Sequence, residues 1–255
     1  MPEPALLVTG TDTGVGKTVV AAAVAACAVA RGRSVAVFKP VQTGVEPGEP
    51  GDVDFVRAAA GPSPLLAEGC AYRLRAPLAP AVAARLEGVV IDPQVLRRRY
   101  AALSAGADVA LVEGAGGLLV PLAEGYATAD LARDLGLAAL IVARPSLGTL
   151  NHTALTVEAA RARGLRVAGV VLSGFPGDPG LAERTNPREI VGLTGAELWG
   201  VLPAITGLDT ERLQPRDLSA RARAGLAPAL GGTFDPDTWM RTLERGALAR
   251  GVTGL

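Results

Sequence analysis

The chain is poor in cysteine, histidine and aromatic residues. Its 255 residues include two cysteines and one histidine, and only 4% of them are aromatic. Cys27 and Cys70 lie far apart without the spacing of metal ligands, so the sequence does not indicate a disulfide framework. His152 has no second histidine and no cysteine pair near it, which argues against a zinc site. We therefore expect reduced thiols and a cytoplasmic protein.

Long hydrophobic runs and an excess of either charge are also missing. The longest apolar run, Val19 to Ala30, is shorter than the roughly 20 residues that cross a bilayer. The N-terminal residues MPEPALLVTG lack the basic start of a signal peptide. Basic and acidic residues number 25 each, so no basic field attracts a phosphate backbone. We expect no membrane partner and no nucleic acid partner.

Lysine is the scarcest of the common charged residues. Only Lys17 and Lys39 are lysines, so 23 of the 25 basic residues are arginines. The composition of the gene could account for the arginine excess. The alternative is that these two positions require a compact, rotatable ammonium that a planar guanidinium cannot replace.

Short apolar runs alternate with longer alanine-rich segments along the chain. This alternation predicts an α/β fold in a single domain over residues 1–255, with a mainly parallel sheet and helices on both faces. The predicted strands are Ala5–Thr9, Ser34–Phe38, Val109–Val112, Ala138–Ala143, Val167–Leu172 and Gly200–Leu202. The predicted helices are Lys17–Ala30, Val53–Ala60, Pro93–Ser104, Thr128–Leu135, Asn151–Arg163 and Pro187–Leu193.

Polar, glycine-rich segments follow four of the predicted strands. They are residues 10–18, 39–44, 113–117 and 146–151. In a parallel sheet these segments meet at the carboxyl edge, where ligands of such sheets bind. The sequence therefore predicts one binding site at that edge.

The first of these segments, GTDTGVGKT, resembles a phosphate-binding loop between a strand and a helix. A Walker A loop reads GxxxxGK[ST], whereas here five residues separate Gly10 from Gly16. The glycines allow backbone N–H groups to surround phosphate oxygens, and the helix N-terminus favours the same anion. Lys17 is expected to contact the phosphates and Thr18 to coordinate Mg²⁺. The alternative is a glycine-rich turn without a ligand.

Carboxylates and a lysine occur in the other segments of this edge. Glu113 follows an apolar strand, and Asp52 or Asp54 could supply a second carboxylate, which is the donor set that Mg²⁺ uses beside phosphate oxygens. Asp52 could instead cap the following helix. Lys39 lies at the end of a buried strand, where an ammonium needs an anion or must reach solvent. Asn151 begins a predicted helix whose free N–H groups could bind a carboxylate, although capping by Asn151 or Thr149 is an equal alternative.

Taken together, GTDTGVGKT, KPVQTG, EGAGGLLVPL and LGTLNHTALT resemble dethiobiotin synthetases. The resemblance covers residues 7 to about 172, and that family's phosphate loop has the same additional residue. It implies a P-loop NTPase-type fold and a ligase activity in biotin biosynthesis, in which 7,8-diaminononanoate, CO2 and ATP give dethiobiotin, ADP and phosphate. It also implies Mg²⁺ and a homodimer in which the neighbouring subunit supplies the site for the substrate carboxylate.

The resemblance and the motifs give an expected set of site residues. The catalytic residues are Lys39, Lys17, Thr13 and Thr43. The nucleotide-binding residues are Thr13, Gly14, Val15, Gly16, Lys17, Thr18, Val19, Glu113, Ser173, Leu202, Pro203, Ala204 and Ile205. The metal ligands are Thr18, Asp52 and Glu113. The substrate-binding residues are Thr13, Lys39, Thr43, Gly114, Ala115, Gly148, Thr149, Leu150 and Asn151.

One residue departs from the family pattern. Many members have an asparagine after the strand Val167–Leu172, where its amide contacts adenine, and this chain has Ser173. We therefore expect a site that accepts CTP or other triphosphates alongside ATP. Two other classes remain open. A partition- or division-type ATPase would have a signature lysine where Asp12 stands, and a cobyrinate-type amidotransferase would need an additional glutaminase domain.

Overall fold

The computed structural model describes residues 4–249, with side chains as far as Leu243. The strands are β1 (Ala5–Gly10), β2 (Val35–Thr43), β3 (Leu66–Leu74), β4 (Val109–Gly117), β5 (Pro121–Ala123), β6 (Tyr126–Ala127), β7 (Ala138–Ala143), β8 (Val167–Phe175) and β9 (Leu198–Pro203). The helices are α1 (Lys17–Val29), α2 (Asp52–Ala60), α3 (Pro80–Leu86), α4 (Pro93–Ser104), α5 (Thr128–Asp134), α6 (Thr149–Ala162), α7 (Leu181–Thr194), α8 (Leu218–Gly225), the short 3-10 helix η1 (Pro228–Leu230) and α9 (Pro236–Ala249).

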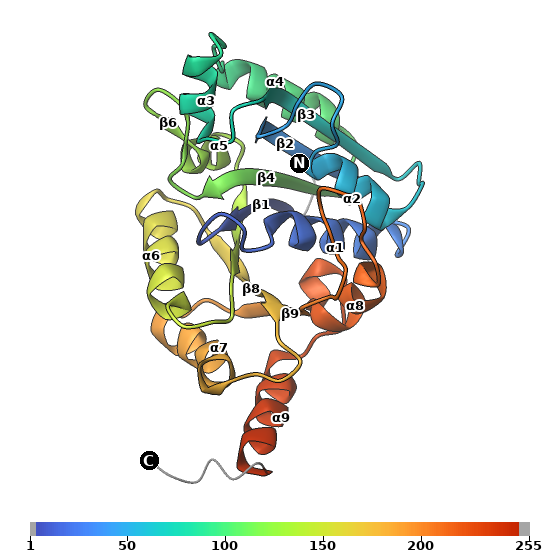
Figure 1. Cartoon of the computed structure of the whole chain (residues 1–255), viewed down its shortest axis with the longest axis vertical. Helices are drawn as coiled ribbons and strands as arrows, with labels where there is room; N and C mark the ends of the chain where they lie inside the picture. The colour runs from blue at the N-terminus through green and yellow to red at the C-terminus, as the bar shows by residue number, and fades with distance from the viewer. Residues whose placement is uncertain (1–3, 250–255) are drawn as a thin grey trace.

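Seven of the strands form one sheet in the order β3-β2-β4-β1-β7-β8-β9. Every neighbouring pair in this sheet is parallel, and β5 and β6 form a separate small hairpin. Helices lie on both sides of the sheet (Figure 1). The predicted fold class, a parallel α/β sheet covered on both faces, is confirmed.

The sheet separates two apolar layers because successive side chains of each strand point to opposite faces. On one face, Leu6 and Val8 of β1 pack with α1, α2 and α8. On the other face, Leu7 packs with α3, α4 and α5. Next to this second layer, α6 and α7 cover β7, β8 and β9. Strands β1 and β7, and most of β8 and β9, are buried on both faces, which is why their sequences consist largely of apolar residues.

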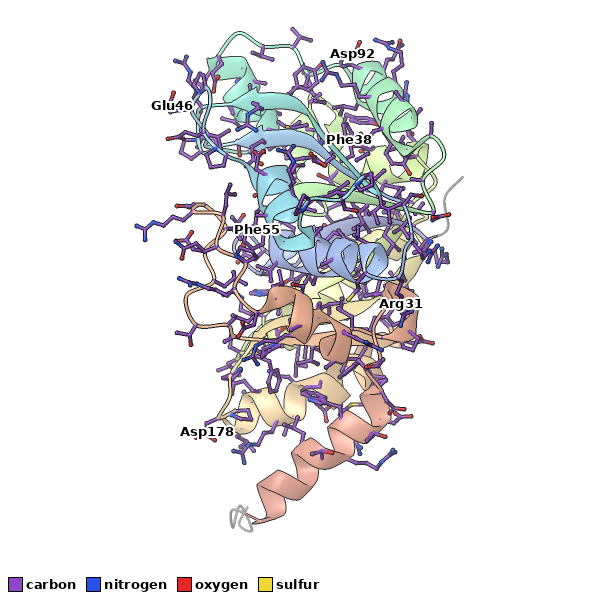
Figure 2. All side chains as sticks on the ribbon, turned by 90° about the vertical axis from the view of Figure 1, so that its right-hand side faces the viewer. Arg31, Phe38, Glu46, Phe55, Asp92 and Asp178 are labelled. Carbon is purple, nitrogen blue, oxygen red and sulfur yellow. The ribbon has the colours of Figure 1, made fainter. Side chains whose placement is uncertain are left out.

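Helix α1 is built almost entirely from alanine and valine, and ten of its thirteen residues are buried. Small side chains allow it to lie close to the sheet while α2 and α8 pack on its outer side. Phe55 of α2 fills the space beside α1 (Figure 2). Arg31, just after α1, donates a hydrogen bond to the carbonyl of Gly232 and ties this layer to the C-terminal region. The phosphate-loop segment is therefore attached to a tightly packed helix.

Several predicted boundaries were wrong. Strands β2 and β4 continue to Thr43 and Gly117, so Lys39 and Glu113 lie within strands and not at strand ends. The extension of β2 is stabilised by β3, whose Cys70 pairs with Lys39. Helix α6 begins at Thr149, two residues before the predicted start. Helix α7 begins at Leu181 and accommodates Pro187 in its interior. The sequence prediction also missed β3, α3, α8 and α9.

In the described part of the chain, no helix is both long enough and apolar enough to span a bilayer. Cys27 and Cys70 are both free thiols, as the sequence predicted. Cys27 is buried and Cys70 is partly buried, and burial raises the pKa of both. Neither thiol is thereby activated as a nucleophile.

Candidate active site

A cleft of about 520 Å³ opens at the carboxyl edge of the sheet. Half of the residues that the sequence analysis selected line it together: Thr13, Gly14, Gly16, Lys17, Thr18, Val19, Lys39, Thr43, Asp52, Glu113 and Ala115. Loop 10–18, β2, α2 and β4 each contribute to this cleft, although these segments are separated in the sequence by up to about a hundred residues. The structure therefore brings these motifs together in one cleft, as the sequence predicted.

The loop between β1 and α1 has the backbone that phosphate binding requires. Gly16 is the N-cap of α1, with φ of 94° in the left-handed region that favours glycine. A side chain at Gly16 would also collide with the hydroxyl of Ser173. The acidic Asp12 in this loop accepts a hydrogen bond from the Thr13 N–H at 2.7 Å and pairs with Arg144 at 2.6 Å. Asp12 thus fixes the part of the loop that contains the additional residue.

Lys17 is buried and reaches back across its own loop. Its ammonium donates to the carbonyl of Asp12 at 3.0 Å. Burial, together with the nearby ammonium of Lys39, lowers the pKa of Lys17. An anion in the cleft would offset both effects, because it would stabilise the two ammonium groups at once.

Lys39 is 4% exposed and lies between two carboxylates. Its Nζ is 2.5 Å from Asp52 Oδ2 and 2.9 Å from Glu113 Oε1, and it donates to the carbonyl of Gly114 at 3.2 Å. The hydroxyl of Thr18 donates to the same Glu113 oxygen at 2.8 Å. These residues come from α1, α2, β2 and β4, so four elements position one compact cluster.

The cluster has perturbed ionisation. Burial raises the pKa of Glu113 to about 7, and the Asp52 carboxylate contributes to the increase while Lys39 opposes it. Burial also disfavours the charged forms of Lys39 and Asp52. For these two residues the attraction of opposite charge prevails, so the pKa of Lys39 is raised and that of Asp52 is lowered. Strongly perturbed carboxylates and amines in a cleft are typical of functional sites.

The donor set of this cluster fits Mg²⁺. Thr18, Asp52 and Glu113 supply a hydroxyl and two carboxylates beside the phosphate loop, and Mg²⁺ usually binds one or two carboxylates together with phosphate oxygens and water. The described residues contain no group of three or more His, Cys, Asp or Glu arranged around a metal position. A metal ion at a site of this composition would need further oxygens, from phosphate or water.

Asp52, and not Asp54, faces the cluster. Helix α2 begins at Asp52 with Gly51 as its N-cap, so Asp52 does not cap the helix. The side chain of Asp54 accepts the Gly51 N–H at 2.7 Å and lies 3.6 Å from the guanidinium of Arg57. Asp54 therefore caps helix α2, and the Asp52 carboxylate can pair with the Lys39 ammonium.

Other predicted residues lie outside the cleft. Val15 is buried beneath the loop, and Ser173 is buried against Gly16. The remaining ones do not line the cleft of their own chain: Gly114, Gly148, Thr149, Leu150, Asn151, Leu202, Pro203, Ala204 and Ile205. The N-cap of α6 is Gly148, with φ of 93°, and no side chain caps this helix. Capping by Thr149 or Asn151, which the sequence left open, does not occur.

Sequence reasoning missed the part of the site that comes from the C-terminal third of the chain. Between β9 and α8, the segment Leu208–Glu211 lines the same cleft as the loop at residues 10–18. This segment lies alongside α2 in both views (Figures 1 and 2). Val41, Gln42 and Gly116 also line the cleft. Gln42 belongs to the quoted KPVQTG motif, but no motif marked residues 208–211.

Comparisons with known proteins give one consistent family. Residues 4–212 match the family model described as an AAA domain. The chain is 51% identical to the ATP-dependent dethiobiotin synthetase BioD of Frankia casuarinae, over 90% of this chain and 94% of that protein. It is 48% identical to the protein of the same name from Streptomyces avermitilis, over 92% of this chain and 96% of that protein.

Among solved structures, the septum site-determining protein MinD of Pyrococcus horikoshii, complexed with Mg-ADP, aligns with a TM-score of 0.55 and 17% identity over 100% of this chain and 99% of that chain. A ParA family ATPase from Chlorobium tepidum aligns with a TM-score of 0.56 and 13% identity over 87% and 96% of the two chains. At these identities the structural likeness supports the P-loop ATPase fold and carries no information about the reaction.

Proposed function

The chain belongs to the dethiobiotin synthetase family, and from that premise we propose how its cleft closes the ring of dethiobiotin. The enzyme is a ligase that uses ATP in biotin biosynthesis. The observation that carries the proposed mechanism is the placement of Lys17, Lys39 and Thr18 in one cleft with two carboxylates. The proposed substrates are 7,8-diaminononanoate, CO2 and a nucleoside triphosphate, and the proposed setting is the cytoplasm.

The proposed reaction begins with a carbamate, formed when one amine of the substrate takes up CO2 and loses a proton. A carbamate oxygen attacks the γ-phosphorus, ADP leaves, and a carbamic-phosphoric anhydride forms. The second amine then attacks the carbonyl carbon and loses a proton, and phosphate leaves as the cyclic urea closes. In the phosphoryl transfer an anionic carbamate must approach an anionic γ-phosphate, so positioning and charge neutralisation supply most of the catalysis of that step.

The side chains of the cleft have distinct proposed roles. Loop residues 13–19 surround the phosphates, and Lys17 contacts the β- and γ-phosphates. Lys39 neutralises the carbamate and the transferring phosphoryl group, whereas Thr13 and Thr43 orient the carbamate. Thr18, Asp52 and Glu113 hold Mg²⁺, which when bound would neutralise phosphate charge. The carboxylates of Asp52 and Glu113 already contact one cation, the Lys39 ammonium, and the Thr18 hydroxyl donates to Glu113, which supports this assignment.

The proposed assembly is a homodimer. Gly148–Asn151 at the start of α6 do not line the cleft of their own chain. The N–H groups at this helix start suit a carboxylate, because a helix N-terminus favours an anion. In the proposed dimer these residues bind the substrate carboxylate in the cleft of the other subunit.

The test is ATP turnover with and without 7,8-diaminononanoate in bicarbonate buffer. We expect ADP release that depends on the diamine and equals the dethiobiotin formed, measured by mass spectrometry. A diamine lacking the carboxylate serves as a control for the proposed substrate site. ATP hydrolysis that ignores the diamine would contradict the proposal and favour a regulatory ATPase with the same fold.

A further inference from the structure

The ammonium of Lys39 has no free donor in this structure. An ammonium has three N–H groups. Here they meet Asp52 Oδ2 at 2.5 Å, Glu113 Oε1 at 2.9 Å and the carbonyl of Gly114 at 3.2 Å. In this arrangement Lys39 cannot also donate to a phosphate or a carbamate. It has to leave at least one of these partners before it can act on an anion in the cleft.

Two of the three partners of Lys39 are the carboxylates that the proposed function gives to the metal. Asp52 and Glu113 provide the two carboxylates, and Thr18 already donates to the Glu113 oxygen that Lys39 contacts. Mg²⁺ binds carboxylate oxygens at about 2.0–2.1 Å. A divalent ion held by both carboxylates would therefore lie against the ammonium, and two cations cannot share that gap.

The charges of the four residues at the base of the cleft balance without a metal. In their ionised forms, Lys17 and Lys39 offset Asp52 and Glu113, and the other two carboxylates that line the cleft, Asp209 and Glu211, are not buried. A divalent ion entering alone would leave this buried cluster with a surplus of two positive charges. The phosphates of a nucleotide bring the negative charge that removes the surplus and give Lys39 a new acceptor.

We propose that Lys39 occupies the cation position of the metal site in the nucleotide-free protein, so that ammonium and metal exclude one another. Metal binds together with the nucleotide, and its arrival moves Lys39 from the carboxylates toward the transferring group. This inference rests on the proposed metal ligands of the preceding section. It adds that the metal site and the free ammonium of Lys39 form in the same step, when the nucleotide binds.

Direct metal binding to the nucleotide-free protein tests the exclusion. Mn²⁺ is the probe, followed by electron paramagnetic resonance and calorimetry, so no turnover is needed. Relative to the wild type, Lys39→Met should bind Mn²⁺ at least about tenfold more tightly, because the two carboxylates lose their cation. Wild-type protein that binds Mn²⁺ as tightly as Lys39→Met overturns the proposal.

Two control variants separate exclusion at the site from a general effect of charge. Lys17→Met removes the same charge from the same cleft, but Lys17 donates to the Asp12 carbonyl and not to the carboxylates. The loss of this charge should tighten Mn²⁺ binding much less than Lys39→Met does, and an equal gain in Lys17→Met and Lys39→Met overturns the proposal. Adding Asp52→Asn to Lys39→Met should remove the gain, and its persistence places the metal elsewhere.

The scarcity of lysine allows a second measurement on the wild-type protein, which decides the question even if Lys39→Met fails to fold. With Lys17 and Lys39 as the only lysines, ammonium labelling with ¹⁵N gives two side-chain NMR signals to assign. Mg²⁺ alone should leave the Lys39 signal in place, and Mg²⁺ with a non-hydrolysable ATP analogue should move it. A moved Lys17 signal with an unmoved Lys39 signal refutes this inference alone, whereas two unmoved signals refute the proposed nucleotide site as well.

Discussion

At the scale of single residues, the two lysines of the cleft differ in their hydrogen-bond partners. Lys17 belongs to the proposed phosphate loop, and its ammonium donates to the carbonyl of Asp12 in the same loop. Lys39 comes from a neighbouring strand and is held by two carboxylates. The chain uses arginine at its other basic positions, so substitution by arginine tests whether each lysine requires a point charge.

Replacing Lys39 by arginine should lower kcat by about 100-fold while the fold persists. The planar guanidinium can pair with a carboxylate through two parallel hydrogen bonds, and it cannot present one compact charge to the carbamate and phosphate. Turnover assays and circular dichroism measure the two effects. Lys17→Ala should differ, because it should weaken nucleotide binding as well as turnover. An arginine variant with near wild-type turnover would contradict the role of Lys39.

The two acidic residues of α2 form a matched pair for testing the metal site. Asp52→Asn should raise the Mg²⁺ concentration for half-maximal activity by about tenfold, because Asp52 faces the cluster. Asp54→Asn should leave it almost unchanged, since Asp54 caps α2. Titrations of activity with Mg²⁺ measure both variants, with metal-free nucleotide binding as the control. A large effect of Asp54→Asn beside a small effect of Asp52→Asn would reverse the assignment.

The enzyme should discriminate only weakly between nucleoside triphosphates with different bases. Ser173 is buried against the phosphate loop at Gly16, so its hydroxyl cannot give the paired contact that an asparagine amide gives to adenine. We expect kcat/KM values for ATP, CTP, GTP and UTP that lie within tenfold of one another, a range of about 1.4 kcal/mol. A preference for ATP beyond that range would refute the prediction, and Ser173→Asn should increase the preference for ATP.

At the scale of elements, the starts of β2 and β4 are joined by a reciprocal contact. Asp108 Oδ2 accepts hydrogen bonds from the Ser34 N–H and the Ser34 hydroxyl, both at 2.8 Å. The Asp108 N–H in turn donates to the Ser34 hydroxyl oxygen at 3.0 Å. These bonds, led by the one from the Ser34 N–H, lower the pKa of Asp108 below its usual range. The contact aligns the two strands that bear Lys39 and Glu113.

Asp108→Asn should therefore lower the melting temperature at neutral pH. A carboxylate with a lowered pKa in the folded state stabilises the fold above its unfolded pKa of about 3.9, and this contribution is lost as pH falls through the lower, folded value. The difference in melting temperature between wild type and variant should consequently shrink at acidic pH. Thermal melts from pH 7 to pH 3 measure it, and a difference that stays constant across this range would contradict the interpretation.

The sequence predicted the elements whose burial is complete and missed those stabilised by their neighbours. Strand β7, apolar on both faces, was predicted with its observed bounds. Strand β3 was missed because LAEGCAYRL mixes polar and apolar residues and pairs only at the sheet edge. Pro187 suggested a late start for α7, although the helix begins at Leu181. Local sequence patterns do not reveal that the packing of a helix can offset the destabilising effect of a proline in its interior.

The candidate site was also predicted only in part from the sequence. Its phosphate loop, Lys39 and Glu113 were predicted from motifs, and the structure brings them into one cleft. The contribution of Leu208–Glu211 could not be predicted, because this segment meets the loop only after the chain has crossed to β9 and returned over α2. Spacing favoured Asp52 over Asp54 as the metal ligand, but it could not show the reason, which is that Asp54 caps α2 while Asp52 pairs with Lys39.

At the scale of the whole molecule, the proposed dimer leaves a measurable consequence at the start of α6. Leu147 is 86% exposed directly before Gly148, and Leu155 is 56% exposed two turns further on. Both lie beside the residues that the proposal places in the partner's cleft. An apolar side chain this exposed in a free subunit suits burial between subunits.

Leu147→Glu should shift the protein toward monomers and lower activity at low enzyme concentration. Leu86→Glu is the matched control, because Leu86 is also exposed but lies at the end of α3, on a different part of the surface. Analytical ultracentrifugation measures the association of both variants. Equal association of Leu147→Glu and the wild type would remove this surface from the proposed interface.

The tight packing of helix α1 restricts the substitutions that this protein can accumulate in evolution. Its buried surface consists largely of methyl groups, between a sheet on one side and α2 and α8 on the other. Most enlargements there add atoms where no space exists, and overpacking of this kind costs about 1–3 kcal/mol for each site. Inherited variation should therefore accumulate in outer helices such as α3 and α9, while the support of the phosphate loop stays nearly fixed in volume.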